Sequence, residues 1–327
     1  MLQNTTSLAF DLKALTTFIE VAESGSMTLA AERLGLTQSG VTRMVARLEQ
    51  DLGTSLLDRR TRPFKPTAAG QELISRARDL LVDAERLQFS VRSTGTDLLS
   101  TVRLGLIDSF TVTAGPALIR ELRGHARNVT VWSGISPNLR QDLIRRRLDF
   151  MISTDPMTGF ADLHETRIMR EPFMLIMPKA MAATIDKPDL AELAANHPFV
   201  RYSVRSMIGD RIERYLIDSG IEIPQRLEFD GSEAVFAMVA AGLGWAITTP
   251  LCLIHSFGYA EGLIALPLPG RGFNRSLYLV GHKENQSGEM TELGNRLAGA
   301  SVKIAHNLVE KKIRPLAPWA ADAIRIG

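Results

Sequence analysis

The chain has 327 residues, of which 45% are hydrophobic and 23% are charged. This length predicts two or three domains that each bury a core, and the composition excludes disordered, collagen-like and coiled-coil-only proteins. Cys252 is the single cysteine, so an internal disulfide is impossible and a cysteine-based zinc site is nearly excluded. The net charge of +2 does not by itself identify a nucleic-acid partner.

One segment, residues 234–254, carries no charge and is long enough to span a bilayer. Gly242, Gly244 and Pro250 interrupt it, which favours a buried helix, a tight turn and a buried strand. The N-terminus lacks a basic region followed by a long apolar run, so we expect no signal peptide and no membrane partner. One thiol without a disulfide framework indicates a cytoplasmic location.

The first 95 residues or so show the apolar periodicity of helices. Asp11 is the expected N-cap of the first helix. Ser26 or Thr28 caps a short second helix, and Thr37 caps a third. The second and third helices form a helix-turn-helix pattern, although helical hairpins without a DNA role are also common.

Polar side chains gather on the exposed face of the third helix. An amide, hydroxyl groups and guanidinium groups on one helix are the groups that read base edges and phosphates in a DNA major groove. The residues are Gln38, Ser39, Thr42, Arg43 and Arg47. Residues 59–65 contain no acid and four cations, which are Arg59, Arg60, Arg62 and Lys65. This segment is placed like a wing on the flanking DNA backbone, and a solvated turn is the alternative.

A long helix is expected from about residue 68 to residue 93, after the N-cap Thr67. Along it, apolar residues recur at steps of four and three, which is the spacing of a helix that faces a partner helix. These residues are Leu73, Ala77, Leu80, Ala84, Leu87 and Val91. We expect a dimerisation seam, with packing onto the chain's own domain as the alternative. Residues 93–96 are typical of a hinge.

From Leu99 onward strands alternate with helices, which predicts a mostly parallel sheet with crossover helices. The pattern restarts near residues 180–189, and the chain returns to the first lobe near Leu263. We therefore expect lobe I over about 99–179 and 263–310 and lobe II over about 180–262. The C-terminal tail, residues 311–327, has no functional interpretation.

Polar side chains follow the predicted strands of both lobes, where ligands bind in open α/β sheets. Hydroxyl groups and helix N-termini suit a small polar or anionic molecule, with Arg201 or Arg205 as its counter-charge. Each serine has helix capping as its alternative role. The candidate contacts are Ser109, Phe110, Ser133, Ser136, Arg201, Tyr202, Ser203 and Thr248.

Taken together, motifs along nearly the whole chain resemble LysR-type transcriptional regulators. The motifs are Ser26–Ala31, Leu34, Thr37–Thr42, Leu48-Glu49, Leu52-Gly53, Leu56–Arg59 and Thr67–Gly70, with Arg147–Ile152 and Ala240–Ile247 in the lobes. The resemblance implies that Gln38, Ser39, Thr42 and Arg43 face DNA and that Arg59 lies in the wing. The sequence departs from the family pattern at Met27, Gly40, Leu57 and Pro66, and none of these changes removes a hydrogen-bond donor.

The fold implied by this resemblance is α/β with an all-α N-terminus. It comprises a winged helix-turn-helix over residues 1–66, a linker helix and hinge over 67–95, and a two-lobed effector-binding domain over 96–327 that is similar to periplasmic binding proteins. The implied function is sequence-specific DNA binding that regulates transcription and is modulated by an effector. The implied partners are double-stranded DNA, a small-molecule effector, and further copies in a homodimer or homotetramer.

Two alternatives are a solute-binding protein and an enzyme of the two-lobed α/β type. A solute-binding protein needs an export signal and no DNA-reading helix. The pair Gly242 and Gly244 lacks the third glycine of a dinucleotide-binding motif, and the six histidines are scattered without ligand spacing. We therefore expect no enzyme activity, no cofactor and no metal.

Overall fold

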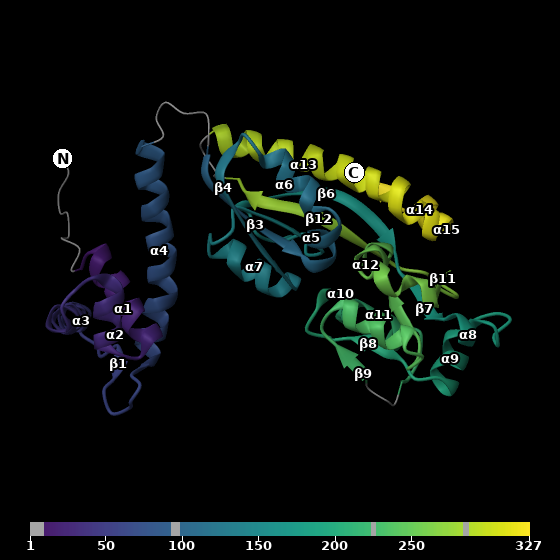
Figure 1. Ribbon diagram of the computed structural model, residues 1–327, viewed down its shortest axis with the longest axis horizontal. Coiled ribbons are helices and arrows are strands. Elements are labelled where there is room, and N and C mark those ends of the chain that lie inside the picture. The colour runs from purple at the N-terminus through teal and green to yellow at the C-terminus, as the bar shows by residue number, and fades with distance from the viewer. Residues whose placement is uncertain (1–9, 93–98, 224–226, 284–287) are drawn as a thin grey trace. The chain divides into compact units, whose positions relative to one another are not determined.

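The computed structural model describes residues 10–92, 99–223, 227–283 and 288–327. The chain divides into two compact units, residues 1–94 and residues 95–327 (Figure 1). The hinge expected over residues 93–96 lies outside the described residues. In the described ranges, no helix combines the length and the apolar character needed to cross a membrane.

In residues 10–92, the first unit consists of four helices and a two-stranded wing. They are α1 (Leu12–Ser24), α2 (Met27–Leu34), α3 (Gln38–Leu52), β1 (Leu57–Asp58), β2 (Lys65–Pro66) and α4 (Ala68–Arg92). Side chains of Asp11, Ser26 and Thr37 cap the first three helices, and a left-handed glycine ends each of them. Thr67 Oγ1 accepts a 3.0 Å hydrogen bond from the Gly70 amide at the start of α4. The predicted helix starts are therefore confirmed.

The core of the first unit lies between α1, α2, α3 and the beginning of α4. Ala30 and Ala31 are buried where α2 packs closely against its neighbours. Val41 and Val45 line the buried face of α3. The opposite face of α3 is thereby left exposed to solvent.

A six-stranded sheet forms the centre of lobe I, in the order β13-β6-β12-β5-β3-β4. The strands are β3 (Leu99–Ile107), β4 (Ala126–Gly134), β5 (Phe150–Ser153), β6 (Leu163–Pro172), β12 (Asn274–His282) and β13 (Arg325–Ile326). β3 is parallel to β4 and β5, whereas β12 is antiparallel to β5 and β6. The expected mostly parallel sheet is therefore wrong: β6 carries the chain toward lobe II and β12 brings it back in the opposite direction.

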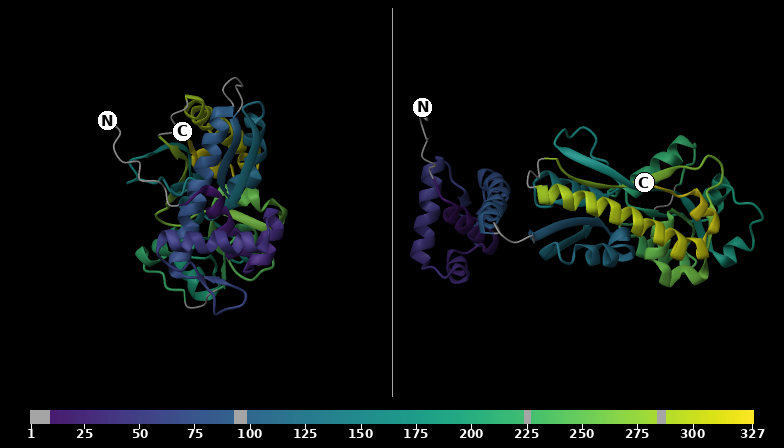
Figure 2. Two further views of the ribbon diagram at one scale, coloured as in Figure 1. Left: turned by 90° about the vertical axis from the view of Figure 1, so that its left-hand side faces the viewer. Right: turned by 90° about the horizontal axis from the view of Figure 1, so that it is seen from above.

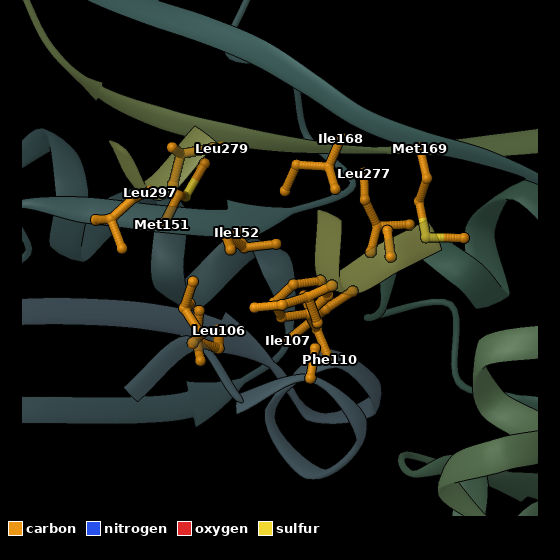
Figure 3. Packing of buried hydrophobic residues seen from close by; sticks show 14 of the residues in the cluster. Leu106, Ile107, Phe110, Met151, Ile152, Ile168, Met169, Leu277, Leu279 and Leu297 are labelled. Carbon is orange, nitrogen blue, oxygen red and sulfur yellow. The ribbon is translucent and has the colours of Figure 1, made fainter. Parts of the chain in front are cut away.

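Helices cover this sheet on both faces. The helices are α5 (Asp108–Thr113), α6 (Gly115–Leu122), α7 (Ser136–Ile144) and α13 (Gly288–Leu308). Helix α13 lies lengthwise along the strands of lobe I (Figure 2). Leu297 of α13 lies beside Met151 and Leu279 in the buried core (Figure 3).

Lobe II contains a three-stranded antiparallel sheet, ordered β10-β7-β11, and a parallel pair, β8-β9. The strands are β7 (Met174–Pro178), β8 (Val200–Tyr202), β9 (Leu227–Phe229), β10 (Ala246–Thr248) and β11 (Leu263–Pro267). The helices are α8 (Lys179–Ala182), α9 (Leu190–Asn196), α10 (Met207–Asp218), α11 (Ser232–Ala240), α12 (Pro250–His255) and the 3-10 helix η1 (Phe257–Gly262). Residues 173–177 and Leu263 pack into the core of this lobe, so its boundaries are wider than residues 180–262.

The C-terminal tail is an integral part of lobe I. A π-helical turn, η2 (Val309–Ile313), leads into α14 (Arg314–Leu316), α15 (Pro318–Ala323) and strand β13. Ile313, Ala320 and Ile324 are buried in the lobe I core. Trp319 packs against the cores of both lobes, so the tail also braces one lobe against the other.

Candidate functional site

Helix α3 presents a row of polar side chains to solvent. Gln38, Ser39, Arg43 and Arg47 are exposed, and Thr42 is half-buried. Thr42 Oγ1 donates to the Gln38 carbonyl at 2.9 Å, which fixes its hydroxyl against the helix. The Arg43 guanidinium makes only a long contact, 3.4 Å, to the Ser39 carbonyl. The predicted residues of α3 thus share one accessible face and keep most of their donors free.

The wing is fastened to α3 by one carboxylate. Glu49 Oε1 accepts hydrogen bonds from the amides of Leu56 and Leu57 at 2.8 and 3.3 Å. Its other oxygen accepts from Arg59 Nη2 at 2.7 Å. Glu49 therefore holds the beginning of the wing and orients the Arg59 side chain.

The other wing arginines are exposed. The hydrogen bond from Arg60 lowers the pKa of Asp58. The guanidinium of Arg62 lies 4.4 Å from the centre of the Phe64 ring. Lys65 is exposed as well, so the wing presents the cations that the sequence predicted for it to solvent.

The expected seam on α4 divides into two parts. Leu73 and Ala77 pack into the core of their own unit, and Ala77 is only 2% exposed. The apolar surface of Ala77 is therefore already covered by its own unit, whereas Leu73 is half-buried and its surface is covered only in part. Leu80 and Leu87 are 46% and 68% exposed, and Ala84 is half-buried. The side chain of Val91 lies outside the described residues.

In the second unit, a small cavity of about 60 Å³ lies between the two lobes. Helices α7, α10 and α11 begin at its wall, and no side-chain cap occupies the N-termini of α7 and α11. Its walls carry six hydroxyl groups, from Ser109, Ser136, Thr154, Tyr202, Ser206 and Ser232. Such a wall offers hydrogen bonds to a polar ligand from both lobes.

Three of the expected contacts line this cavity: Ser109, Ser136 and Tyr202. Thr248 lies behind the wall, with its hydroxyl 2.7 Å from the Tyr202 hydroxyl. Burial raises the pKa of Tyr202 well above its ordinary value, so Tyr202 is a neutral phenol at physiological pH.

The remaining expectations need correction. Phe110 is fully buried in the lobe I core, and Ser203 is buried where its Oγ accepts from the Arg205 amide. Ser133 is exposed and donates to Asp108. None of these three residues lines the cavity.

The expected counter-charges also lie elsewhere. Arg201 is buried within lobe II, where it pairs with Glu213 at 2.8 Å. It does not line the cavity. Arg205 is exposed and pairs with Asp230.

The cation that does line the cavity is Arg275, which the sequence did not indicate. Its Nε donates to Glu171 Oε1 at 2.7 Å, and Glu171 Oε2 accepts from the Leu251 amide at 2.9 Å. Burial alone lowers the pKa of Arg275, but its partners, chiefly the facing Glu171 carboxylate, together outweigh this effect and the net shift is upward. Arg275 Nη2 also lies 3.6 Å from Cys252 Sγ. A buried ion pair thus closes one end of the cavity.

A second feature absent from the expectations is a serine–histidine contact. The Ser232 hydroxyl lies 2.7 Å from His255 Nδ1 at the cavity wall. Within the described ranges, no hydrogen bond or ion pair joins His255 to a carboxylate, so the third member of a catalytic triad is missing there. Nor does the described part of the chain hold a group of three or more His, Cys, Asp or Glu residues suited to a metal ion.

Comparison with known proteins assigns both units to one family. Residues 12–71 match the family described as bacterial regulatory helix-turn-helix protein, lysR family, and residues 96–298 match the LysR substrate binding domain. The chain belongs to the LysR family of transcriptional regulators. It is therefore a DNA-binding transcriptional regulator with an effector-binding domain, as the resemblance of its motifs implied.

The uncharacterized HTH-type transcriptional regulator YfeR of Shigella flexneri is 31% identical over 251 residues, which cover 75% of this chain and 80% of that protein. Among solved structures, CbnR complexed with its target DNA has a TM-score of 0.68 and 22% identity, covering 89% of this chain and 100% of that chain. Full-length OxyR from Pseudomonas aeruginosa has a TM-score of 0.63 and 21% identity, covering 89% and 94%. These structural likenesses establish the expected fold for this LysR-family chain.

Proposed function

We propose that α3 reads base edges and that the wing holds the DNA backbone. The main support is the α3 face on which Gln38, Thr42 and Arg43 lie together, opposite a fully buried apolar face. Arg43 and Gln38 have the planar donor geometry that recognises guanine and adenine edges in the major groove. Arg59, which Glu49 orients, is suited to a phosphate contact. Such contacts position the protein on DNA without reading its sequence.

The test is a gel-shift titration of operator and random DNA at several salt concentrations. Replacing Arg43 with Ala should cost about 1–3 kcal/mol on the operator and little on random DNA. Replacing Arg59 with Ala should weaken binding to both DNAs and reduce the salt dependence. Arg76→Ala is the matched control, because Arg76 is an exposed arginine of α4 outside the α3 face and the wing. Unchanged operator affinity of Arg43→Ala would contradict the assignment of α3.

The interlobe cavity is the proposed effector site. Its hydroxyl-rich wall and the uncapped N-termini of α7 and α11 suit a small polar or anionic molecule. Since Glu171 already neutralises Arg275, the helix N-termini are the better partners for an anionic group. The cavity of about 60 Å³ is smaller than typical ligand pockets of roughly 300 Å³ or more. Binding a metabolite of ordinary size therefore requires the lobes to separate and close again.

This site can be tested by a thermal-shift screen of hydroxy acids, amino acids and sugars, followed by DNA footprinting with the best ligand. Ser136→Gln fills the cavity and should abolish both the thermal shift and the ligand-dependent footprint. Thr130→Gln on the exposed side of β4 is the control. A Ser136→Gln variant that still responds at the wild-type ligand concentration would place the sensor elsewhere.

We further propose that Leu80, Ala84 and Leu87 on α4 pair two chains, and that lobe contacts assemble dimers into a tetramer. The exposed leucines support the first step, because large apolar side chains on one helix stripe favour burial against a partner. We also propose that the protein acts in the cytoplasm, where its DNA target lies, and that it is not an enzyme. Turnover of a model ester that depends on Ser232 would contradict the last point.

A further inference from the structure

A second concave surface of the effector unit is strongly cationic. Two adjoining cavities of about 310 and 550 Å³ share Arg170, Arg211 and Asn274 in their walls. Among the described residues, their walls together contain five arginines and a single carboxylate, that of Asp218. The arginines are Arg167, Arg170, Arg211, Arg214 and Arg271. We name this surface the arginine pocket.

The arginine pocket depends on an irregularity in β6. Arg167 and Arg170 are three residues apart in β6, and residues at that spacing in a regular strand face opposite sides of the sheet. However, the register between β6 and β12 shifts at Leu277 and Tyr278, so that Ser276 lies opposite Arg170 and Tyr278 lies opposite Arg167. Ser276 and Tyr278 share one face of β12, and this β-bulge therefore brings both arginines onto that face.

The tail adds a further cation beside this face. β13 pairs with β6 so that Arg325 lies directly opposite Arg170. Like charges at directly opposite positions destabilise a sheet. The backbone carbonyls of Asp322 and Ile324 accept hydrogen bonds from Arg325, and among the residues that the structure describes no carboxylate pairs with it.

Most of this charge lacks an acidic partner. Asp210 pairs with Arg214 at 2.9 Å, and Arg167 donates to the Gly327 carbonyl at 2.8 Å. Within the described ranges, the exposed guanidinium groups of Arg170, Arg211 and Arg271 have no ion pair or hydrogen bond. Three free guanidinium groups beside one wall carboxylate leave a net positive site.

From this arrangement we propose that the arginine pocket binds a small molecule with at least two anionic groups, phosphates or carboxylates. Guanidinium groups bind such oxygens through paired, charge-assisted hydrogen bonds. Asn274, Ser276 and Tyr278 supply neutral hydrogen-bonding groups in the same wall. The concave shape and a volume of hundreds of Å³ fit a small molecule better than a DNA backbone.

The ligand of the arginine pocket bridges the two lobes. Arg167 and Arg170 come from β6 of lobe I, whereas Arg211 and Arg214 come from α10 of lobe II (Figure 1). Thr154 lines both this pocket and the effector cavity, where its hydroxyl lies 3.2 Å from that of Ser136. The pocket is otherwise lined by different residues from the effector cavity, so the proposal stands without the proposed effector site.

The test is isothermal titration calorimetry of the full-length protein with sodium pyrophosphate and, separately, with citrate. Ionic strength is held constant with sodium chloride. Arg170→Gln/Arg211→Gln should weaken binding at least about tenfold, as expected when hydrogen bonds to a charged partner are removed. The matched control is Arg123→Gln/Arg145→Gln, which removes two exposed arginines outside the arginine pocket. It should bind as the wild type does.

Comparing the two ions distinguishes a phosphate ligand from a carboxylate ligand. Thermal unfolding without added anion verifies that each variant is folded, and at low salt Arg170→Gln should melt higher than the wild type because it relieves repulsion from Arg325. Three results would overturn the proposal: no binding of either ion to the wild type, equal affinity in wild type and Arg170→Gln/Arg211→Gln, or an equal loss in the control variant.

Discussion

Removal of Arg275 tests how the floor of the effector cavity is stabilised. Glu171 is fully buried and Arg275 is 4% exposed, so neither charge is solvated. In Arg275→Met the Glu171 carboxylate keeps the Leu251 amide as a donor but loses the buried cation that neutralises its charge. Breaking a buried pair on one side costs about 3–5 kcal/mol. Since a domain is stable by only about 5–15 kcal/mol, the variant should lose about a fifth of its stability or more.

Two further variants separate charge from packing. Glu171→Gln/Arg275→Met removes both charges while the glutamine oxygen still accepts from the Leu251 amide, so most of the lost stability should return. Arg205→Met breaks an ion pair whose partners are 72% and 62% exposed, and it should change stability far less.

Urea unfolding monitored by tryptophan fluorescence is the appropriate assay. Trp132, Trp245 and Trp319 all belong to residues 95–327, so fluorescence reports on the effector-binding unit alone. A penalty for an unpaired buried charge is excluded if Arg275→Met unfolds within about 1 kcal/mol of the wild type, a loss typical of an ordinary substitution, or if the double variant is as unstable as the single one.

Three other predictions concern assembly, the tail and acid stability. Leu80→Asp places a charge in the proposed seam and should lower the oligomeric state in analytical ultracentrifugation, whereas the same mass as the wild type would exclude a role for Leu80. Trp319→Ala should lower stability by up to about 3 kcal/mol in the urea assay, because it removes packing against both lobes, and a neutral effect would contradict that packing. The hydrogen bond from Arg314 lowers the pKa of Glu310, so this group stabilises the folded state above its ordinary pKa and the contribution is lost as pH falls through the lowered value. Glu310→Gln should therefore be less stable than wild type at pH 7, the difference should shrink as the pH falls into the acid range, and a pH-independent difference would contradict this sign.

The first unit could be predicted from sequence because its signals are local. An N-cap and its amide are separated by three residues, as in Asp11 to Ala14, and the C-terminal glycines directly follow their helices. The α3 face follows from the helical period alone. By contrast, nothing local shows that Ala77 is covered by its own unit while Leu80 remains exposed, since both belong to the same heptad pattern.

The sheet of lobe I was harder to predict. β6 carries no clear strand signal, because its sequence, LHETRIMREP, mixes charged and apolar residues without strict alternation. The bulge opposite Leu277 and Tyr278 interrupts the period of two, and a single sequence cannot reveal where pairing with a distant strand shifts. The tail was uninterpreted for a similar reason, since β13 joins the sheet through β6 more than 150 residues earlier.

The effector cavity was predicted in part. Ser109, Ser136 and Tyr202 were found because they lie where strands end and helices begin, which is a rule of topology. Arg275 and Glu171 were not found because they are 104 residues apart and meet only through strand pairing. Arg201 was a reasonable choice by charge, but burial beside Glu213 gave it a structural role instead.

Strand β6 connects the effector cavity and the arginine pocket physically. Neighbouring residues of a strand face opposite sides, so Glu171 closes the effector cavity through Arg275 while Arg170 faces the arginine pocket. Both ligands would therefore act on one strand and on the same pair of lobes. A ligand shifts a conformational equilibrium only through unequal affinity for its states. If an anion in the arginine pocket favours the closed lobes, it must tighten effector binding, and the effector must tighten anion binding by the same factor.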